Sequence, residues 1–355
     1  MRQRTAAAEK TDARRRFQRY KPENSRLVRE AKIKQSKGYG VLKSLLKVSK
    51  KIGEEVAKEY HEEEHNAEFY RRILDLVKGV KFDQQDIQTL LIRDSEDSDL
   101  GLLISALINN SDMEEFALPT GGLKSTPTDL GYCNRKNLII MGNSGEAFGS
   151  NMEGGTVIIH GDGHSEVAGG GICYGMKGGK VLVKGNVGDM TGQGMEDGEI
   201  IIEGDAYLWL GSGMEGGRIV VMGHGGVALG SFMKGGEIIC ECDVGEGLGQ
   251  GMARGKIVVK GNAGDEAAEG MKGGLVIIEG NAGDWLGNSN LEERKEVKMK
   301  SCPMKGGKIV VKGNAGRFVG EGILGGEIHL EGGYISLGTP VHGKIYHKGK
   351  LIVDK

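Results

Sequence analysis

Short runs of β-branched and aliphatic residues recur along the chain from Gly131 onward, and glycines bracket each run. A unit reads close to Met-x-Gly-Gly-x-Ile-Val-Val-x-Gly-Asn-x-Gly, as it does from Met252 to Gly264. The Met position occurs eight times, and Ile323 fills it once more; the successive spacings are 24, 19, 19, 19, 19, 19, 33 and 19 residues. The methionines concerned are Met152, Met176, Met195, Met214, Met233, Met252, Met271 and Met304. A fixed period of this length is typical of a solenoid, here with insertions of 5 and 14 residues in two units.

The three apolar residues of each unit predict one short strand, and the glycines predict tight corners with positive φ. Strands of successive coils then stack at about 4.8 Å. A degenerate first unit around Cys133 and a shortened last unit around Pro340 bring the prediction to about eleven coils of 19 residues. Because right-handed crossovers dominate between parallel strands, we expect a right-handed parallel β-helix. The fold class is therefore mainly β, with an α-helical region before the β-helix.

Residues at equivalent positions form columns along such a solenoid. The Met column is expected to fill the coil interior or a corner, since a flexible thioether adapts to small gaps. A second column predicts a structural ladder at one corner, because Asn and Asp tolerate left-handed backbone and cap their own turns. Its members are Asn143, Asp162, Asn186, Asp205, His224, Asp243, Asn262, Asn281 and Asn314.

The middle apolar residue of each strand should point away from the interior, since side chains alternate along a strand. These residues are Ile139, Ile158, Leu182, Ile201, Val220, Ile239, Val258, Ile277 and Val310, and His329 interrupts the column. An apolar stripe of this length is normally covered. We expect either the N-terminal segment or another subunit to cover it.

Residues before Gly131 have a different composition, with only 7 of the 63 glycines. Residues 1–52 hold 17 Lys or Arg and 4 Asp or Glu, so their charge is +13 and the rest of the chain carries −15. The organisation predicted is a basic N-terminal arm over 1–37, an α-helical region over 38–130 that covers or caps the solenoid, and the β-helix over 131–355. Within the second region, three- and four-residue apolar spacing predicts a helix from Val41 to Val77 broken near Gly53, then helices over 83–93 and 100–109, the last capped by Ser98 or Asp99.

Few residues suggest catalysis or metal binding. His61 and His65 enclose three glutamates with zinc-protease spacing, but a charged helix face explains them better, and no third ligand is evident. Five scattered cysteines and no signal peptide indicate reduced thiols in a cytoplasm, and no apolar run is long enough to span a membrane. We therefore assign no catalytic, cofactor-binding or metal-binding residues. An enzyme acting in a groove would need the acidic column of Glu146, Asp189, Glu246, Asp265 and Asp284, which a solvated face also explains.

The repeated unit over residues 131–355 resembles the GXGXG domain family. That family includes the C-terminal β-helix of the glutamate synthase large subunit, its stand-alone archaeal relatives, and the β-helical subunit of formylmethanofuran dehydrogenase. The resemblance implies a non-catalytic part of a larger redox enzyme. Flavin, iron–sulfur or molybdenum/tungsten centres would then belong to partner chains, and none to this chain. Residues 1–130 match no motif of the family.

The function expected is thus a scaffold subunit of a glutamate synthase-type complex that docks catalytic redox subunits. A scaffold in a formylmethanofuran dehydrogenase complex is the alternative, on the loose similarity of the insertion before Met304. A nucleic-acid-binding protein that acts through the basic arm is a further alternative, although the arm favours an acidic protein surface, and no membrane is expected as a partner. The insertions at 169–174 and 288–303 are the expected specific contact points.

Overall fold

The computed structural model describes residues 38–59, 62–163, 171–288 and 303–355, and these belong to one compact unit. The basic arm, His61, residues 169–170 of the first insertion and residues 289–302 of the second lie outside the described residues. Four helices come first: α3 (Tyr39–Glu59), α4 (Glu62–Leu76), α5 (Gln84–Asp94) and α6 (Leu100–Asn109). In the described part of the chain, none of the helices combines the length and apolar character needed to cross a membrane.

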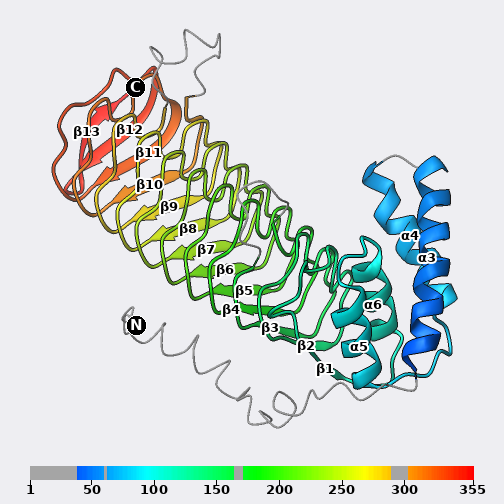
Figure 1. Ribbon diagram of the computed structural model, residues 1–355. Coiled ribbons are helices and arrows are strands. Elements are labelled where there is room, and N and C mark those ends of the chain that lie inside the picture. Colours follow the sequence, from blue (N-terminus) through cyan, green and yellow to red (C-terminus); the bar gives the residue numbers. More distant parts are fainter. Residues whose placement is uncertain (1–37, 60–61, 164–170, 289–302) are drawn as a thin grey trace. The chain divides into compact units, whose positions relative to one another are not determined.

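One sheet of 13 strands follows, ordered along the chain from β1 to β13 (Figure 1). The strands are β1 (Glu115–Leu118), β2 (Asn137–Ile140), β3 (Thr156–Ile159), β4 (Lys180–Val183), β5 (Glu199–Ile202), β6 (Arg218–Val221), β7 (Glu237–Cys240), β8 (Lys256–Val259), β9 (Leu275–Ile278), β10 (Lys308–Val311), β11 (Leu324–Leu330), β12 (His342–His347) and β13 (Lys350–Asp354). Neighbours from β1 to β12 pair in parallel, and β13 turns back antiparallel on β12. The expected β-solenoid of about eleven turns is confirmed.

The first and third apolar residues of the strands make the solenoid core. Ile200 and Ile202 of β5, for example, are fully buried, and so are their register partners in β6. The Met column is also fully buried, as predicted from its spacing.

The second glycine of the Met-x-Gly-Gly sequence has a packing reason. A Cβ placed on Gly179 would lie 2.6 Å from Cε of Met152 in the preceding coil, and its φ is +91°. The same relation holds between Met195 and Gly217, at 2.7 Å. The methionine of one coil therefore occupies the space that a side chain in the next coil would need.

The helices differ from the prediction in one place. The first predicted helix ends at Glu59 and resumes at Glu62, whereas Gly53 lies inside α3. A Cβ on Gly53 would lie 3.1 Å from the ring of Phe69 in α4, so this glycine permits close helix packing and does not break the helix. The helices over 83–93 and 100–109 are confirmed within one residue, but Asp99 caps α6 without a side-chain hydrogen bond.

The sheet begins earlier than the repeat does. Strand β1 starts at Glu115, and α5 packs against it. The side-chain amides of Gln84 and Gln88 both donate to the carbonyl of Ala117, the second at 2.9 Å. Helix α5 thus satisfies backbone groups at this end of the sheet, which would otherwise be an open edge.

Candidate functional site

The Asn and Asp column is a hydrogen-bonded ladder, as expected. Oδ1 of Asn186 accepts the backbone N–H of Asp205 at 2.8 Å, and Oδ1 of Asp205 accepts that of His224 at 2.7 Å. In later coils, Oδ1 of Asp243 accepts the backbone N–H of Asn262 at 2.6 Å. Each side chain therefore satisfies a backbone donor one coil further on, which leaves the column a structural role.

His224 interrupts this ladder because an imidazole has no oxygen at the Oδ1 position. We expect His224→Asn to raise the free energy of unfolding by about 0.5 to 1.5 kcal/mol, the usual net contribution of one added hydrogen bond. Chemical denaturation of the full chain measures this change. His224→Ala, which adds no acceptor, should show no gain; an equal gain in both variants would contradict the ladder argument.

The acidic column is also used by the backbone. Oδ1 of Asp265 accepts the N–H of Asp284, and Oδ1 of Asp284 accepts that of Arg317, both at 2.7 Å. Asp189, 6% exposed, accepts from the N–H of Leu208 at 3.0 Å. These carboxylates act as coil-to-coil links, so their regular spacing needs no catalytic explanation.

His65 lies in a contact between α4 and the start of the solenoid. Its ring is 5.8 Å from that of Phe69, and its neighbour Asn66 donates to Oδ1 of Asp129 at 3.4 Å. Among the residues that the structure describes, no three His, Cys, Asp or Glu side chains form a group able to hold a metal ion. His65 thus takes part in helix packing, and its proposed partner His61 is not among the described residues.

Four of the five cysteines lie in the described ranges, and all four are free thiols. Burial raises the pKa of Cys173 to about 12, and that of Cys133 and Cys240 to about 11. A buried, protonated thiol is a poor nucleophile and a poor metal ligand. These three cysteines therefore behave as small apolar residues.

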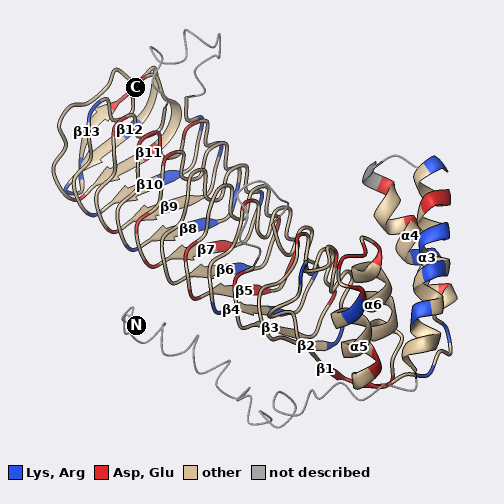
Figure 2. Cartoon of the chain, viewed as in Figure 1, with Lys and Arg blue, Asp and Glu red and all other residues tan. Residues whose placement is uncertain are grey.

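The outer face of the sheet combines apolar and charged rows. The middle residues of the central strands are nearly buried, with Ile201 only 2% exposed. Beside them, Arg218 lies 3.2 Å from Glu199 and 3.3 Å from Glu237, and Lys256 lies 2.9 Å from Glu237. Figure 2 shows these charges alternating from strand to strand.

A second charged row lies on the other side of the apolar residues. Lys184 pairs with Glu203 at 2.8 Å, and Lys312 pairs with Glu279 at 2.8 Å. Partial burial acts to raise the pKa of Glu279, but the hydrogen bond to Lys312 and the charge of Lys260 lower it overall. The long charged side chains can cover apolar neighbours with their stems.

The described helices lie at one end of the sheet and not along the apolar column. Their contact with the sheet is made at β1, through α5. Along the column, the flanking ion-paired rows provide a local cover. The apolar column by itself therefore does not require a partner subunit.

The turns before Met214 and Met233 carry a different surface. Four large side chains there are exposed, which we call the aromatic patch: Tyr207, Trp209, Val227 and Phe232. Trp209 and Phe232 have φ values of 56° and 58°. Neighbouring coils hold Gly213 and Gly251 at the Phe232 position, whereas the Trp209 position varies from Ala228 to Trp285. Phe232 is 57% exposed and lies over Gly251, whose added Cβ would be 2.6 Å from its ring. Large rings at positions that accept glycine are not needed by the solenoid.

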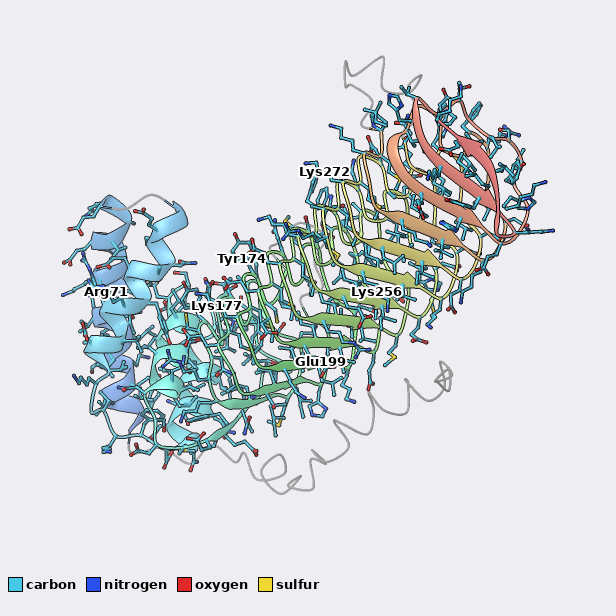
Figure 3. The ribbon with its side chains drawn as sticks, turned by 180° about the vertical axis from the view of Figure 1, so that it is seen from behind. Arg71, Tyr174, Lys177, Glu199, Lys256 and Lys272 are labelled. Atoms are coloured by element: carbon cyan, nitrogen blue, oxygen red, sulfur yellow. The ribbon has the colours of Figure 1, made fainter. Side chains whose placement is uncertain are left out.

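The repeat did not predict this patch, although the sequence shows a large residue at a position where other coils have glycine. Phe232 stands where Gly194, Gly213 and Gly251 recur at the same point of the unit. Figure 3 shows another exposed aromatic residue, Tyr174, on the turn side of the solenoid, whereas Glu199 and Lys256 lie over the strands. Two residues of the aromatic patch, Tyr207 and Phe232, are therefore found at departures from the glycine columns of the repeat.

Neither the protein-family models nor the curated protein sequences contain a match to this chain.

Proposed function

We propose that this chain is a non-catalytic scaffold subunit of a multi-subunit redox enzyme of the glutamate synthase type. The observation that carries the proposal is the aromatic patch, because Tyr207 and Phe232 expose rings at positions where neighbouring coils have glycine. Clustered aromatic side chains are the residues that contribute most to protein–protein binding. The resemblance of the repeated unit to the GXGXG domain supports the class of complex.

The structural use of the polar columns supports the same proposal. The Asn and Asp side chains at the solenoid corner, and the carboxylates of Asp265 and Asp284, accept backbone hydrogen bonds between coils. A catalytic carboxylate must instead be available to substrate. In this proposal the reaction belongs to the partner chains, which also carry any flavin, iron–sulfur or molybdenum/tungsten centre.

The proposal predicts that capture of partner chains depends on the patch. The full chain, tagged at its N-terminus, would be purified from its native cells under anaerobic conditions, and bound proteins identified by mass spectrometry. Trp209→Ala combined with Phe232→Gly should reduce the captured redox subunits about tenfold or more, since each anchor residue contributes about 1 to 3 kcal/mol. Both replacements restore residues that the repeat accepts at these positions, so the fold should be retained.

The matched control is Ile335→Ser, which removes an apolar side chain from the last coils that is at least as exposed as those of the patch. It should leave capture unchanged. Capture of no redox protein by the unmodified chain would contradict the scaffold proposal. Tungsten or molybdenum in the captured complex would identify the formylmethanofuran dehydrogenase alternative. A flavin with glutamate synthase activity would identify a complex of the glutamate synthase type.

A further inference from the structure

The aromatic patch lies in the most acidic part of the solenoid. Residues 185–251 contain 11 Asp or Glu and only 2 Lys or Arg, although the solenoid before and after them holds several lysines. One of the two basic residues, Arg218, is on the outer face of the sheet, where it pairs with Glu199 and Glu237. On the turn side the basic residue of this stretch is Lys234, which pairs with Glu215 at 2.8 Å.

Exposed carboxylates lie close to the patch in three successive coils. Glu196 and Glu215 each follow a methionine of the repeat, two residues beyond the column that contains Phe232. Glu246 occupies the same column as Val227, one coil further on, and its carbonyl accepts the N–H of Ala228 at 2.8 Å. All three glutamates are exposed. The patch thus shares neighbouring coils with exposed negative charge.

This combination selects one class of partner. The face of an indole or phenol ring attracts a cation, and Arg is the side chain most often found in such contacts. Arg can place its guanidinium on an aromatic ring while its remaining N–H groups bind a carboxylate. An acidic segment would gain the apolar contact but would meet like charge at Glu196 and Glu246.

We propose that the aromatic patch and the glutamates beside it bind an arginine-bearing, extended segment of a partner protein. The arginine side chains lie on Trp209 and Phe232, and Glu196 and Glu246 supply the countercharge. The inference names the chemistry of the partner and rests on the proposed scaffold function. It specifies the surface that the partner must offer, whichever redox complex it belongs to.

A peptide titration tests the inference on the purified full-length chain. The probe is a fluorescent peptide of alternating arginine and glycine, and the control probe is the same peptide with glutamate in place of arginine; binding is followed by fluorescence anisotropy. We expect the arginine peptide to bind and the glutamate peptide not to bind. The affinity should fall as salt is added, because exposed charges are screened.

Two variants locate the binding. Trp209→Ala with Phe232→Gly should weaken the binding of the arginine peptide at least about fivefold, and Glu196→Gln with Glu246→Gln should do the same. The matched control is Glu203→Gln with Glu279→Gln, which makes the same change of net charge on the outer face of the sheet and should leave the affinity unchanged. Equal losses in the control pair, or unchanged affinity in both patch variants, would overturn the inference.

Different results would overturn the scaffold function and the arginine-bearing partner. Capture of redox subunits that depends on the patch, together with no binding of the arginine peptide, would overturn the partner chemistry and leave the scaffold function standing. Binding of the peptide at the patch without captured redox subunits would overturn the scaffold function alone.

Discussion

Gly101→Ala is expected to destabilise the protein by about 3 kcal/mol or more, the upper range for overpacking a buried site. Gly101 is the second residue of α6, and a Cβ placed on it would overlap the carbonyl oxygen of Thr128. Both partners in this contact are backbone, so no side-chain rotation can relieve it. Every residue of α6 from Leu100 to Ile108 is buried, which prevents the helix from moving away.

The measurement is the free energy of unfolding, followed by helical circular dichroism and by the fluorescence of Trp209 and Trp285, both in the solenoid. The helical signal should be lost at lower denaturant in the variant. Gly40→Ala is the control, since nothing lies within 4 Å of its added Cβ in α3. It should stabilise by about 0.5 to 1 kcal/mol. Similar stability in both variants would contradict the close backbone contact.

Asp129→Asn is expected to stabilise the protein at pH 7 by about 2 to 3 kcal/mol, because each pKa unit corresponds to about 1.4 kcal/mol. Burial raises the pKa of Asp129 to about 6, the charge of Glu146 adds to the rise, and His65 opposes it. Ionised Asp129 therefore costs stability at neutral pH. Its φ of 56° suits asparagine, whose Oδ1 can still accept from Asn66.

The same shift sets a pH dependence. The folded pKa lies above the ordinary value of about 4, so the folded protein holds this proton more tightly than the unfolded chain does. Protonated Asp129 therefore stabilises the folded protein relative to ionised Asp129. This stabilisation is complete below about pH 4 and is lost as the pH rises through about 6. The difference in unfolding free energy between Asp129→Asn and the unmodified chain should therefore shrink as the pH falls from 7 to 5. Thermal and denaturant unfolding at several pH values measure it.

Asp265→Asn is the control for this pH series, because the amide keeps the Oδ1 that accepts from Asp284. Its stability should follow that of the unmodified chain. A constant difference between Asp129→Asn and the unmodified chain from pH 7 to pH 5 would contradict a raised pKa at Asp129.

The period of the chain predicted most of the solenoid. Strand positions, the buried Met column and the corner ladder all depend on local sequence and on one repeat length, and all three can be found without coordinates. Strand β1 could not be predicted in this way, since Glu115–Leu118 lacks the flanking Gly-Asn pattern and its register with β2 is set by tertiary packing. The reversal of β13 is likewise outside the repeat.

The surface was harder to predict than the core. Whether the apolar column needs a cover depends on which charged residues stand beside it. Along the sequence these residues alternate in sign, in the order Lys180, Glu199, Arg218, Glu237 and Lys256. These residues form a row only across coils, because each strand contributes a single charged residue to it. The aromatic patch was not predicted, because the repeat alone does not show which of its exceptions, such as Phe232, are exposed.

The fit of one methionine against the glycine of the next coil has a consequence for how such a protein can change in length. Lys308 pairs with Leu275 across 33 residues in the register that other coils keep across 19, so the 14 added residues leave the stacking intact. A deletion of part of a coil would instead separate the methionine of that coil from its glycine in the next. Gene duplication can therefore lengthen the solenoid only in whole coils, in steps of about 4.8 Å. The distance between any two surfaces on it is then a whole number of such steps, and selection can adjust that distance without redesigning either surface.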